Sequence, residues 1–220
     1  LDEEPLIQNP RNPVTAGDGS GTLVFDHVSF QYPDGEAPVL RDITFEARRG
    51  DTIAFIGSTG SGKSTLINLI PRFYDISSGS IRIDNVDVRR YDLKALREKI
   101  GFIPQKALLF TGSINENIRY GKHNAVQTEV EHSAKVAQAY DFITEKPKQF
   151  EEMIEEGGGN VSGGQRQRLS IARAVVRKPD IYIFDDSFSA LDFKTDANLR
   201  KQLKYETKDA ITLIVAQRVT

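Results

Sequence analysis

The segment Gly57–Thr65, GSTGSGKST, has the residue types and the spacing needed to hold a phosphate group. It matches the pattern GxxxxGK[ST] and directly follows an apolar run, Thr52–Ile56, that predicts a strand. Its glycines let the backbone amides turn inward around phosphates, and the helix predicted to begin at Lys63 adds the positive end of its dipole. Lys63 would supply a mobile charge and Ser64 a hydroxyl ligand for Mg²⁺. The predicted phosphate contacts are Gly57, Ser58, Thr59, Gly60, Ser61, Gly62, Lys63, Ser64 and Thr65.

A second glycine-rich helix start lies at Val161–Gln165, VSGGQ. Ser162 is a natural N-cap, and the glycines after it leave backbone amides bare at a helix N-terminus, where an anion can bind. One chain with one nucleotide needs only one such site, so the second site suggests a nucleotide presented by another chain. The alternative is a glycine-rich helix cap without a ligand.

Two carboxylates, Asp185 and Asp186, end the apolar run Ile181–Phe184. Such a run predicts a strand buried on both faces of a parallel sheet. A sheet of this kind would deliver the carboxylates to the magnesium of the phosphate loop.

The elements that must position these motifs alternate between strands and helices, which predicts an α/β fold. Near Ser80–Val88 the turn pair Asp84-Asn85 predicts a hairpin, and the phosphate-loop helix should run to Pro71. Thr128–Glu131 is a capping-box pattern within a helix-rich middle region, so we expect an inserted helical subdomain. The other predicted strands are Thr22–Tyr32 with Val24 and Val28 on one face, Ile43–Ala47, Ile100–Ile103 and Ile211–Ala216.

Composition excludes several protein classes. The 220 residues are 39% hydrophobic and 27% charged, with a net charge of −2, so bulk nucleic-acid coating is not expected. The chain has no cysteine and therefore no disulfide framework. No apolar run is long enough to cross a bilayer. Because the sequence begins at Leu1 rather than at methionine, we expect a fragment, with the Pro- and Gly-rich segment 1–21 as a linker of little regular structure.

Over essentially Thr22–Thr220, this combination of motifs resembles the nucleotide-binding domain of an ATP-binding-cassette (ABC) transporter. GSTGSGKST, VSGGQ followed by RQRLSIARA, IYIFDD and SALD carry the resemblance. It implies a P-loop NTPase (RecA-like) parallel-sheet core with an N-terminal antiparallel β part and an α-helical subdomain at about 92–176. It also implies ATP and Mg²⁺ as cofactors, a linker at 1–21 from a missing transmembrane domain, and a nucleotide-binding domain at 22–220 whose C-terminal end is truncated.

The resemblance also assigns roles to single residues. Tyr32 would stack on adenine, Gln105 would be the Q-loop glutamine that touches Mg²⁺ and senses the membrane domain, and Asp185 would be the Walker B magnesium ligand. Glu156, in an acidic loop, would face the membrane domain's coupling helices; this loop and SINENI before Tyr120 indicate the exporter type. Core packing for Tyr32 and a solvated turn for Glu156 are the alternatives. The signature would be Val161, Ser162, Gly163, Gly164 and Gln165, and the D-loop Ser189, Ala190, Leu191 and Asp192.

Two positions depart from the family pattern. Asp186 stands where the family has its glutamate base, and Gln217 stands where it has its switch histidine. A general base must come within about 2.6 to 3.2 Å of the proton that it takes, so the shorter carboxylate should address the attacking water poorly. Glutamine can hydrogen-bond to a phosphate but carries neither a proton nor a charge. The catalytic set Lys63, Gln105, Asp186 and Gln217 therefore predicts a site that holds ATP and hydrolyses it slowly.

Relatives of this kind act as head-to-tail dimers in which each ATP lies between one phosphate loop and the other chain's signature. With an intact signature and a weak site of its own, the chain resembles one half of a heterodimeric multidrug-type exporter, whose partner would carry glutamate and histidine at the two positions. We expect it at the cytoplasmic face of the cell membrane, as a soluble part of an integral membrane transporter, and without a nucleic-acid partner.

Two other functions stay open. A soluble cassette ATPase acting on ribosomes or DNA is disfavoured because the chain has neither a second phosphate loop nor heptads. An ATP-dependent interaction module without turnover is kept open by Asp186 and Gln217.

Overall fold

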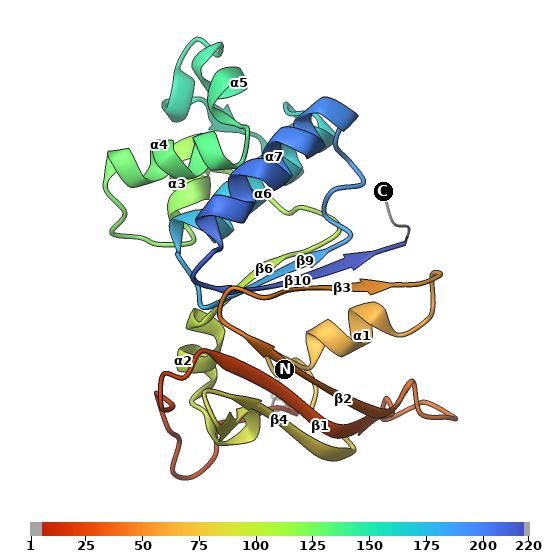
Figure 1. The fold of residues 1–220 in the computed structure, drawn as a ribbon. Helices are drawn as coiled ribbons and strands as arrows, with labels where there is room; N and C mark the ends of the chain where they lie inside the picture. Colours follow the sequence, from red (N-terminus) through yellow and green to blue (C-terminus); the bar gives the residue numbers. More distant parts are fainter. Residues whose placement is uncertain (1–5, 218–220) are drawn as a thin grey trace. The chain divides into compact units, whose positions relative to one another are not determined.

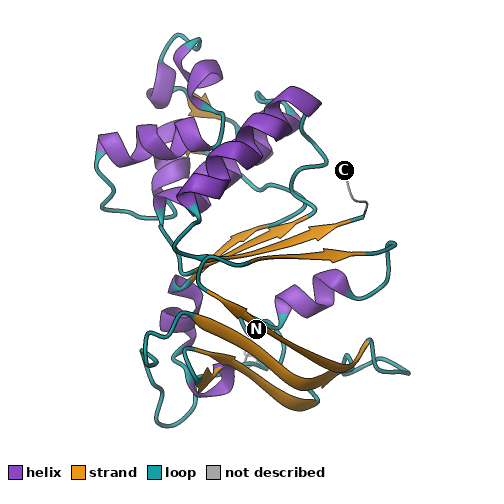
Figure 2. Cartoon of the chain, in the orientation of Figure 1, coloured by secondary structure: helices purple, strands orange, loops and turns teal. Residues whose placement is uncertain are grey.

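The structure is a computed structural model that describes residues 6–217. The chain divides into a first unit, Leu1–Ile100 with Asp209–Thr220, and a second unit, Gly101–Lys208. Figure 1 labels the helices and strands, and Figure 2 separates them by type. None of the helices in residues 6–217 is long and apolar enough to cross a membrane.

The first unit contains an antiparallel sheet with the strand order β2-β1-β4-β5. The predicted hairpin is confirmed, because Asp84 and Asn85 adopt left-handed φ values of 48° and 59° at its turn. The predicted face of β1 is only partly right. The register with β2 shifts between Phe25 and Val28, and upstream of this bulge Phe25 is buried while Val24 is half-buried. The strands are β1 (Thr22–Phe30), β2 (Leu40–Arg48), β4 (Ser78–Ile83) and β5 (Val86–Asp87).

The same unit holds the strand and the helix that flank the phosphate loop. Strand β3 (Thr52–Ile56) pairs in parallel with β10 (Ile211–Ala216), both within the predicted bounds. Phe55 of β3 lies against Phe45 of β2, with 5.5 Å between the ring centroids. Helix α1 (Lys63–Asn68) is shorter than predicted. The regular helix ends at Asn68, and the chain continues to Pro71 in turns.

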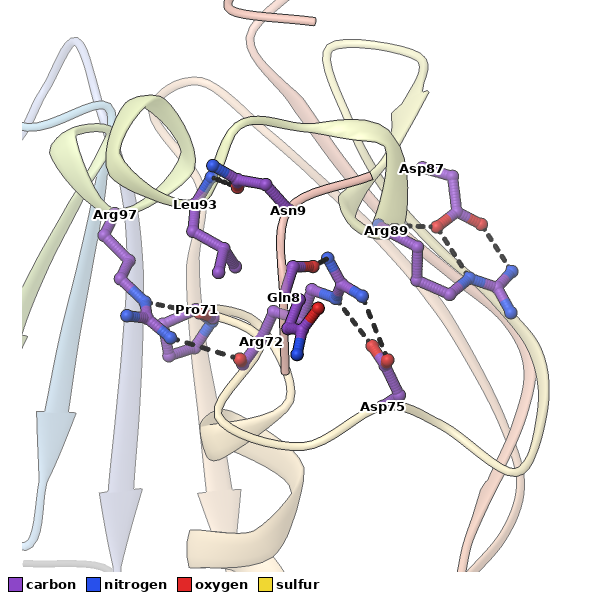
Figure 3. A network of polar contacts seen from close by, with 9 residues as sticks. All are labelled: Gln8, Asn9, Pro71, Arg72, Asp75, Asp87, Arg89, Leu93 and Arg97. Atoms are coloured by element: carbon purple, nitrogen blue, oxygen red, sulfur yellow. Dashed lines mark hydrogen bonds and ion pairs between the residues drawn. The ribbon is translucent and has the colours of Figure 1, made fainter. Parts of the chain in front are cut away.

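Residues 6–21 contain only an isolated bridge, as predicted, but they are fastened to the first unit (Figure 3). Arg72, whose side chain is buried, donates two hydrogen bonds to Asp75 and a third to the carbonyl of Gln8 at 3.1 Å. Asn9 accepts the amide of Leu93 at 2.8 Å and so helps to cap a helix. Gln8 is therefore hydrogen-bonded to the segment that follows α1, and Asn9 to the start of the next helix. The elements there are the 3₁₀ turn η1 (Val88–Arg90) and helix α2 (Leu93–Glu98).

The second unit is mostly helical. Helix α6 packs against α3 and α4, strand β9 neighbours β6, and the short strands β7 and β8 pair with each other. Strand β6 begins at the last residue of the first unit. The elements are β6 (Ile100–Ile103), β7 (Gly112–Ser113), α3 (Ile114–Arg119), α4 (Gln127–Val136), α5 (Tyr140–Thr144), η2 (Gln149–Glu151), β8 (Met153–Ile154), η3 (Glu156–Gly158), α6 (Gly163–Val176), β9 (Ile181–Asp185) and α7 (Phe193–Glu206).

The predicted start of α4 is wrong. The helix begins at Gln127, and Val126 takes the N-cap position instead of Thr128. The carboxylate of Glu129 accepts the Val126 amide at 3.1 Å, which satisfies one of the free amides of the first turn. A second acidic residue two positions from Glu129 made the sequence pattern ambiguous.

Candidate functional site

The loop Gly57–Thr65 has the backbone that a phosphate cradle needs. Gly60 and Gly62 adopt left-handed φ values of 83° and 87°, which side-chain-bearing residues rarely adopt. A Cβ atom on Gly62 would lie 3.1 Å from Leu40 Cδ2, so the space there is also closed. The glycine spacing found in the sequence is therefore required by the conformation, and chance composition does not explain it.

Lys63 lies with its ammonium group inside this loop. Its Nζ donates to the carbonyl oxygens of Gly57 and Ser58 at 2.6 and 2.7 Å, and to Ser61 Oγ at 3.0 Å. A Cβ atom on Gly57 would lie 3.0 Å from Ser61 Oγ. The loop thus folds tightly around one positive charge at the start of a helix, an arrangement that attracts phosphate.

Tyr32 stands beside the phosphate-loop helix. Its hydroxyl lies 2.9 Å from Thr65 Oγ1, and its ring makes edge contacts with Phe30 and Tyr74 at centroid distances of 4.8 and 5.2 Å. Tyr32 is half-buried, and Tyr74 is 38% exposed. A half-buried ring near the phosphate loop leaves the predicted role of Tyr32 in stacking on a base as a hypothesis.

Gln217 follows the strand that pairs with β3. Ala216 is in register with Ile56, so Gln217 comes immediately after the residue opposite the end of β3, where the phosphate loop begins. Its side chain is exposed. The first unit therefore brings the predicted switch position to the start of the phosphate loop.

The second unit brings Gln105 and Asp186 together across 81 residues of sequence. Gln105 Nε2 donates to Asp186 Oδ2 at 3.1 Å. Asp185 is the last residue of β9, and Asp186 turns the chain away with a left-handed φ of 46°. Aspartate is among the few residues that tolerate this conformation, because its short polar side chain can bond locally. The amide of Gln105 and two carboxylates thus gather at the ends of β6 and β9.

The signature begins helix α6 as predicted. Ser162 Oγ accepts the Gln165 amide, and Gln165 Oε1 accepts the Ser162 amide, both at 3.1 Å. This capping box fixes the first turn, and Ser162 and Gly163 are exposed. Val161 is buried beneath them. The exposed glycine amide at the N-terminus of a 14-residue helix is available to an anion from outside the chain.

The D-loop lies against the signature. A Cβ atom on Gly164 would come within 3.2 Å of the carbonyl oxygen of Ala190 and within 3.8 Å of Leu191. Ser189 Oγ donates to the carbonyl of Asp186 at 2.9 Å, which links the D-loop to the carboxylate pair. Asp192 caps α7, and hydrogen bonds from the side chain and backbone of Thr195 lower the pKa of the Asp192 carboxyl.

Sequence reasoning missed the side chains that hold these loops. Arg166 Nη1 donates to the carbonyls of Gly158 and Val161 at 3.0 and 2.9 Å, and so fixes the loop that carries the exposed Glu156. Gly158 has a φ of 76°, and a Cβ atom there would lie 2.7 Å from Arg166 Cδ. Gln167 donates to the carbonyl of Pro104, the residue before Gln105. The polar residues at the start of α6, which include Arg166 and Gln167, were the sequence signal that could have indicated these contacts.

The residues assigned to Mg²⁺ have fitting donor chemistry. Ser64, Asp185 and Gln105 offer hydroxyl, carboxylate and amide oxygens, which are hard ligands of the kind that Mg²⁺ takes. Within residues 6–217, no group of three or more His, Asp or Glu side chains could hold a metal alone. Mg²⁺ is usually held by one or two carboxylates together with substrate phosphates.

A glycine loop of this conformation, between a parallel strand and a helix, defines the class of P-loop nucleotide-binding proteins. The sequence pattern of the family described as ABC transporter matches residues 40–189. The chain therefore belongs to the ABC transporter family. Its fold is that of an ABC ATPase domain, an α/β P-loop NTPase with a parallel sheet and an antiparallel β part, and the family binds nucleotide.

Three relatives place the chain within this family. A Staphylococcus aureus (strain NCTC 8325 / PS 47) protein named "Putative multidrug export ATP-binding/permease protein" is 44% identical over 220 residues, which are 100% of this chain and 38% of that protein. A Bacillus subtilis (strain 168) protein named "Uncharacterized ABC transporter ATP-binding protein" is 47% identical over 201 residues, or 91% and 35% of the two chains. The solved structure of a bacterial Atm1-family ABC exporter with ATP bound superposes with a TM-score of 0.91 and 34% identity, over 96% of this chain and 37% of that one. The chain thus spans between 35% and 38% of the length of these relatives.

Proposed function

We propose that this chain is the ATP-binding and ATP-hydrolysing motor domain of an ABC exporter at the cytoplasmic face of a membrane. One observation carries the proposal. A single chain holds both a phosphate loop folded around Lys63 and an exposed, capped helix N-terminus at Ser162. A head-to-tail dimer with a second nucleotide-binding domain would join each loop to the other chain's signature. The multidrug-export name of a relative at 44% identity supports an export role.

In its own site, the chain's residues would bind and orient ATP. The loop amides and Lys63 would hold the β- and γ-phosphates, and Tyr32 would stack on the base. Ser64, Asp185 and Gln105 would hold Mg²⁺, which when bound neutralises charge on the phosphate oxygens. The domain would comprise 22–220, with a helical subdomain at about 92–176 and the segment 1–21 as the linker from a transmembrane domain.

We propose further that this site turns over slowly. Asp186 has a carboxylate one methylene shorter than the family's glutamate, and it accepts a hydrogen bond from Gln105. Gln217, at the place of the switch histidine, can contact a phosphate but cannot carry a proton. The intact signature would instead complete an active site on a different partner subunit with glutamate and histidine at these positions.

We propose that the second unit also carries the surface that would meet the membrane domain's coupling helices. A cavity of about 320 Å³ is lined by the exposed side chains of Leu108, Phe110 and Tyr120. Arg173 lies 5.1 and 5.6 Å from the centroids of the two rings and donates to the Leu108 carbonyl at 2.8 Å. This cavity would receive one part of the coupling helices, and the exposed loop at Glu156 would face them separately.

The test separates the two composite sites in an assembled transporter. Ser162→Ala with Gly164→Asp should leave ATP binding at the Lys63 loop nearly intact and strongly reduce steady-state hydrolysis, because the added carboxylate repels the partner's phosphate. The same two changes in the partner's signature should do less, because they damage the site that already carries Asp186 and Gln217. Equal losses, or a larger loss from the partner's side, would show that the strong and weak sites are assigned the wrong way round.

A matched control distinguishes this effect from a lost helix cap. Ser113 caps α3 in the same reciprocal way that Ser162 caps α6, accepting the Glu116 amide at 3.1 Å, with glutamate in place of Gln165 as the partner. Ser113→Ala therefore removes an equivalent cap away from the signature, and it should lower stability without shifting hydrolysis between the two sites.

A further inference from the structure

We propose that Gln167 is a positioning residue that connects the signature helix to the pair formed by Gln105 and Asp186. When the partner's ATP displaces Ser162, Gln167 would transmit that displacement to the chain's own nucleotide site. The inference rests on the proposed function.

Gln167 is a buried polar side chain with a directed contact. It is 2% exposed, and its Nε2 donates to the carbonyl oxygen of Pro104 at 3.1 Å. Gln167 belongs to α6, five residues after Ser162, so a rise of 1.5 Å per residue puts about 7.5 Å of helix between the two residues. A regular helix of this length moves as one piece. A displacement of Ser162 would therefore also displace Gln167 and, through its hydrogen bond, the Pro104 carbonyl.

The segment that receives this contact is held on two sides. Ile103, at the end of β6, has its carbonyl bonded by Ser187 Oγ at 2.8 Å, and Ser187 directly follows the carboxylate pair. Pro104 has no N–H, so its carbonyl is its only strong backbone hydrogen-bonding group, and Gln167 occupies it. The next residue is Gln105, whose amide donates to Asp186 at 3.1 Å.

These contacts form one continuous chain within the second unit, from Ser162 along α6 to Gln167, then to Pro104, Gln105 and Asp186. A shift of α6 therefore pulls the backbone next to Gln105 and changes the place of its amide relative to Asp186. Without the Gln167 donor, the Gln105 side chain would keep its chemistry and lose its fixed position.

The test uses Gln167→Met in the full-length transporter, because methionine keeps the length and helix preference of glutamine and cannot donate. The partner subunit carries alanine at its own phosphate-loop lysine, so that only this chain's loop binds ATP. The readout is the gain in ATP affinity that Mg²⁺ provides over EDTA. Since hydrogen bonds of this kind are worth about 1 kcal/mol, we expect the gain to fall by about three- to tenfold. Affinity without Mg²⁺ should not change.

A double-mutant cycle shows whether Gln167 acts through Gln105. Gln105→Ala should reduce the same gain, and adding Gln167→Met to it should change nothing more. Gln167→Leu, measured alongside, supplies a second variant without a donor. Gln202→Met on the exposed face of α7 is the control for the substitution itself and should leave the gain at its wild-type value.

Additive effects of the two changes, or an unchanged Mg²⁺ gain in Gln167→Met with only a lower unfolding temperature, would show that Gln167 merely satisfies a buried carbonyl. The proposed function fails separately. If the unmodified transporter shows no ATP binding that depends on Lys63, the motor assignment is wrong, whatever Gln167 does.

Discussion

Replacing Gly62 by alanine tests whether the phosphate loop is held in its conformation by steric necessity. At φ 87°, an alanine costs about 1–2 kcal/mol for the left-handed backbone alone. Its Cβ would also lie 3.1 Å from Leu40 Cδ2 and 3.2 Å from Val39 Cγ1, which is closer than ordinary packing. Overpacking of this kind costs about 1–3 kcal/mol more. The total loss expected in the free energy of unfolding is therefore about 2–5 kcal/mol.

Gly60 provides the matched control. Its φ is 83°, nearly the same, but a Cβ atom there would meet nothing within 4 Å. Gly60→Ala should therefore cost only the backbone strain, about 1–2 kcal/mol. Urea unfolding of the purified domain measures both losses, and the difference between them isolates the contact with Leu40 and Val39. Equal losses for the two variants, or a neutral Gly62→Ala, would refute the steric argument.

Two further predictions concern turnover and base contact. Asp186→Glu should raise single-turnover hydrolysis at this chain's site only partly, and the double change with Gln217→His should raise it more; wild-type hydrolysis at the ~1–100 s⁻¹ of phosphoryl-transfer enzymes would contradict the slow site. Tyr32→Phe should keep ATP affinity within about twofold, whereas Tyr32→Ala should lose the ~1–3 kcal/mol typical of base stacking on an aromatic ring. Equal affinities of these two variants in a nucleotide titration would show that the ring does not stack on the base.

Local patterns explain most of what the sequence predicted correctly. The predicted strands Thr52–Ile56 and Ile211–Ala216 match their observed bounds, because a short apolar run between turn signals is typical of a buried strand. The β1 bulge was not predictable, because it depends on pairing with two neighbouring strands at once. The start of α4 was missed because Glu129 and Glu131, two residues apart, both fit the acidic position of a capping pattern, and in the folded chain Glu129 accepts the Val126 amide.

In the candidate site, too, local motifs were predictable from the sequence, and contacts between distant residues were not. The phosphate loop and the signature are contiguous in sequence, and their glycines and caps follow from local backbone requirements. The contact between Gln105 and Asp186 joins residues 81 positions apart, and that between Gln167 and Pro104 spans 63 positions. No single-sequence pattern encodes such pairs, because only the folded chain determines which donor meets which acceptor.

The central claim, that this chain binds ATP through its phosphate loop, is tested most directly by titrating Mg·ATP into the purified wild-type transporter and its Lys63→Ala variant. In both transporters, the partner subunit carries alanine at its own phosphate-loop lysine, so that only this chain's loop binds ATP. Lys63 is the charge around which the loop folds, and charge-assisted hydrogen bonds are worth about 1.5–3 kcal/mol, so affinity should fall by about ten- to a hundredfold. Lys201→Ala, an exposed lysine on α7, should bind like the wild type. Unchanged affinity in Lys63→Ala would contradict the account.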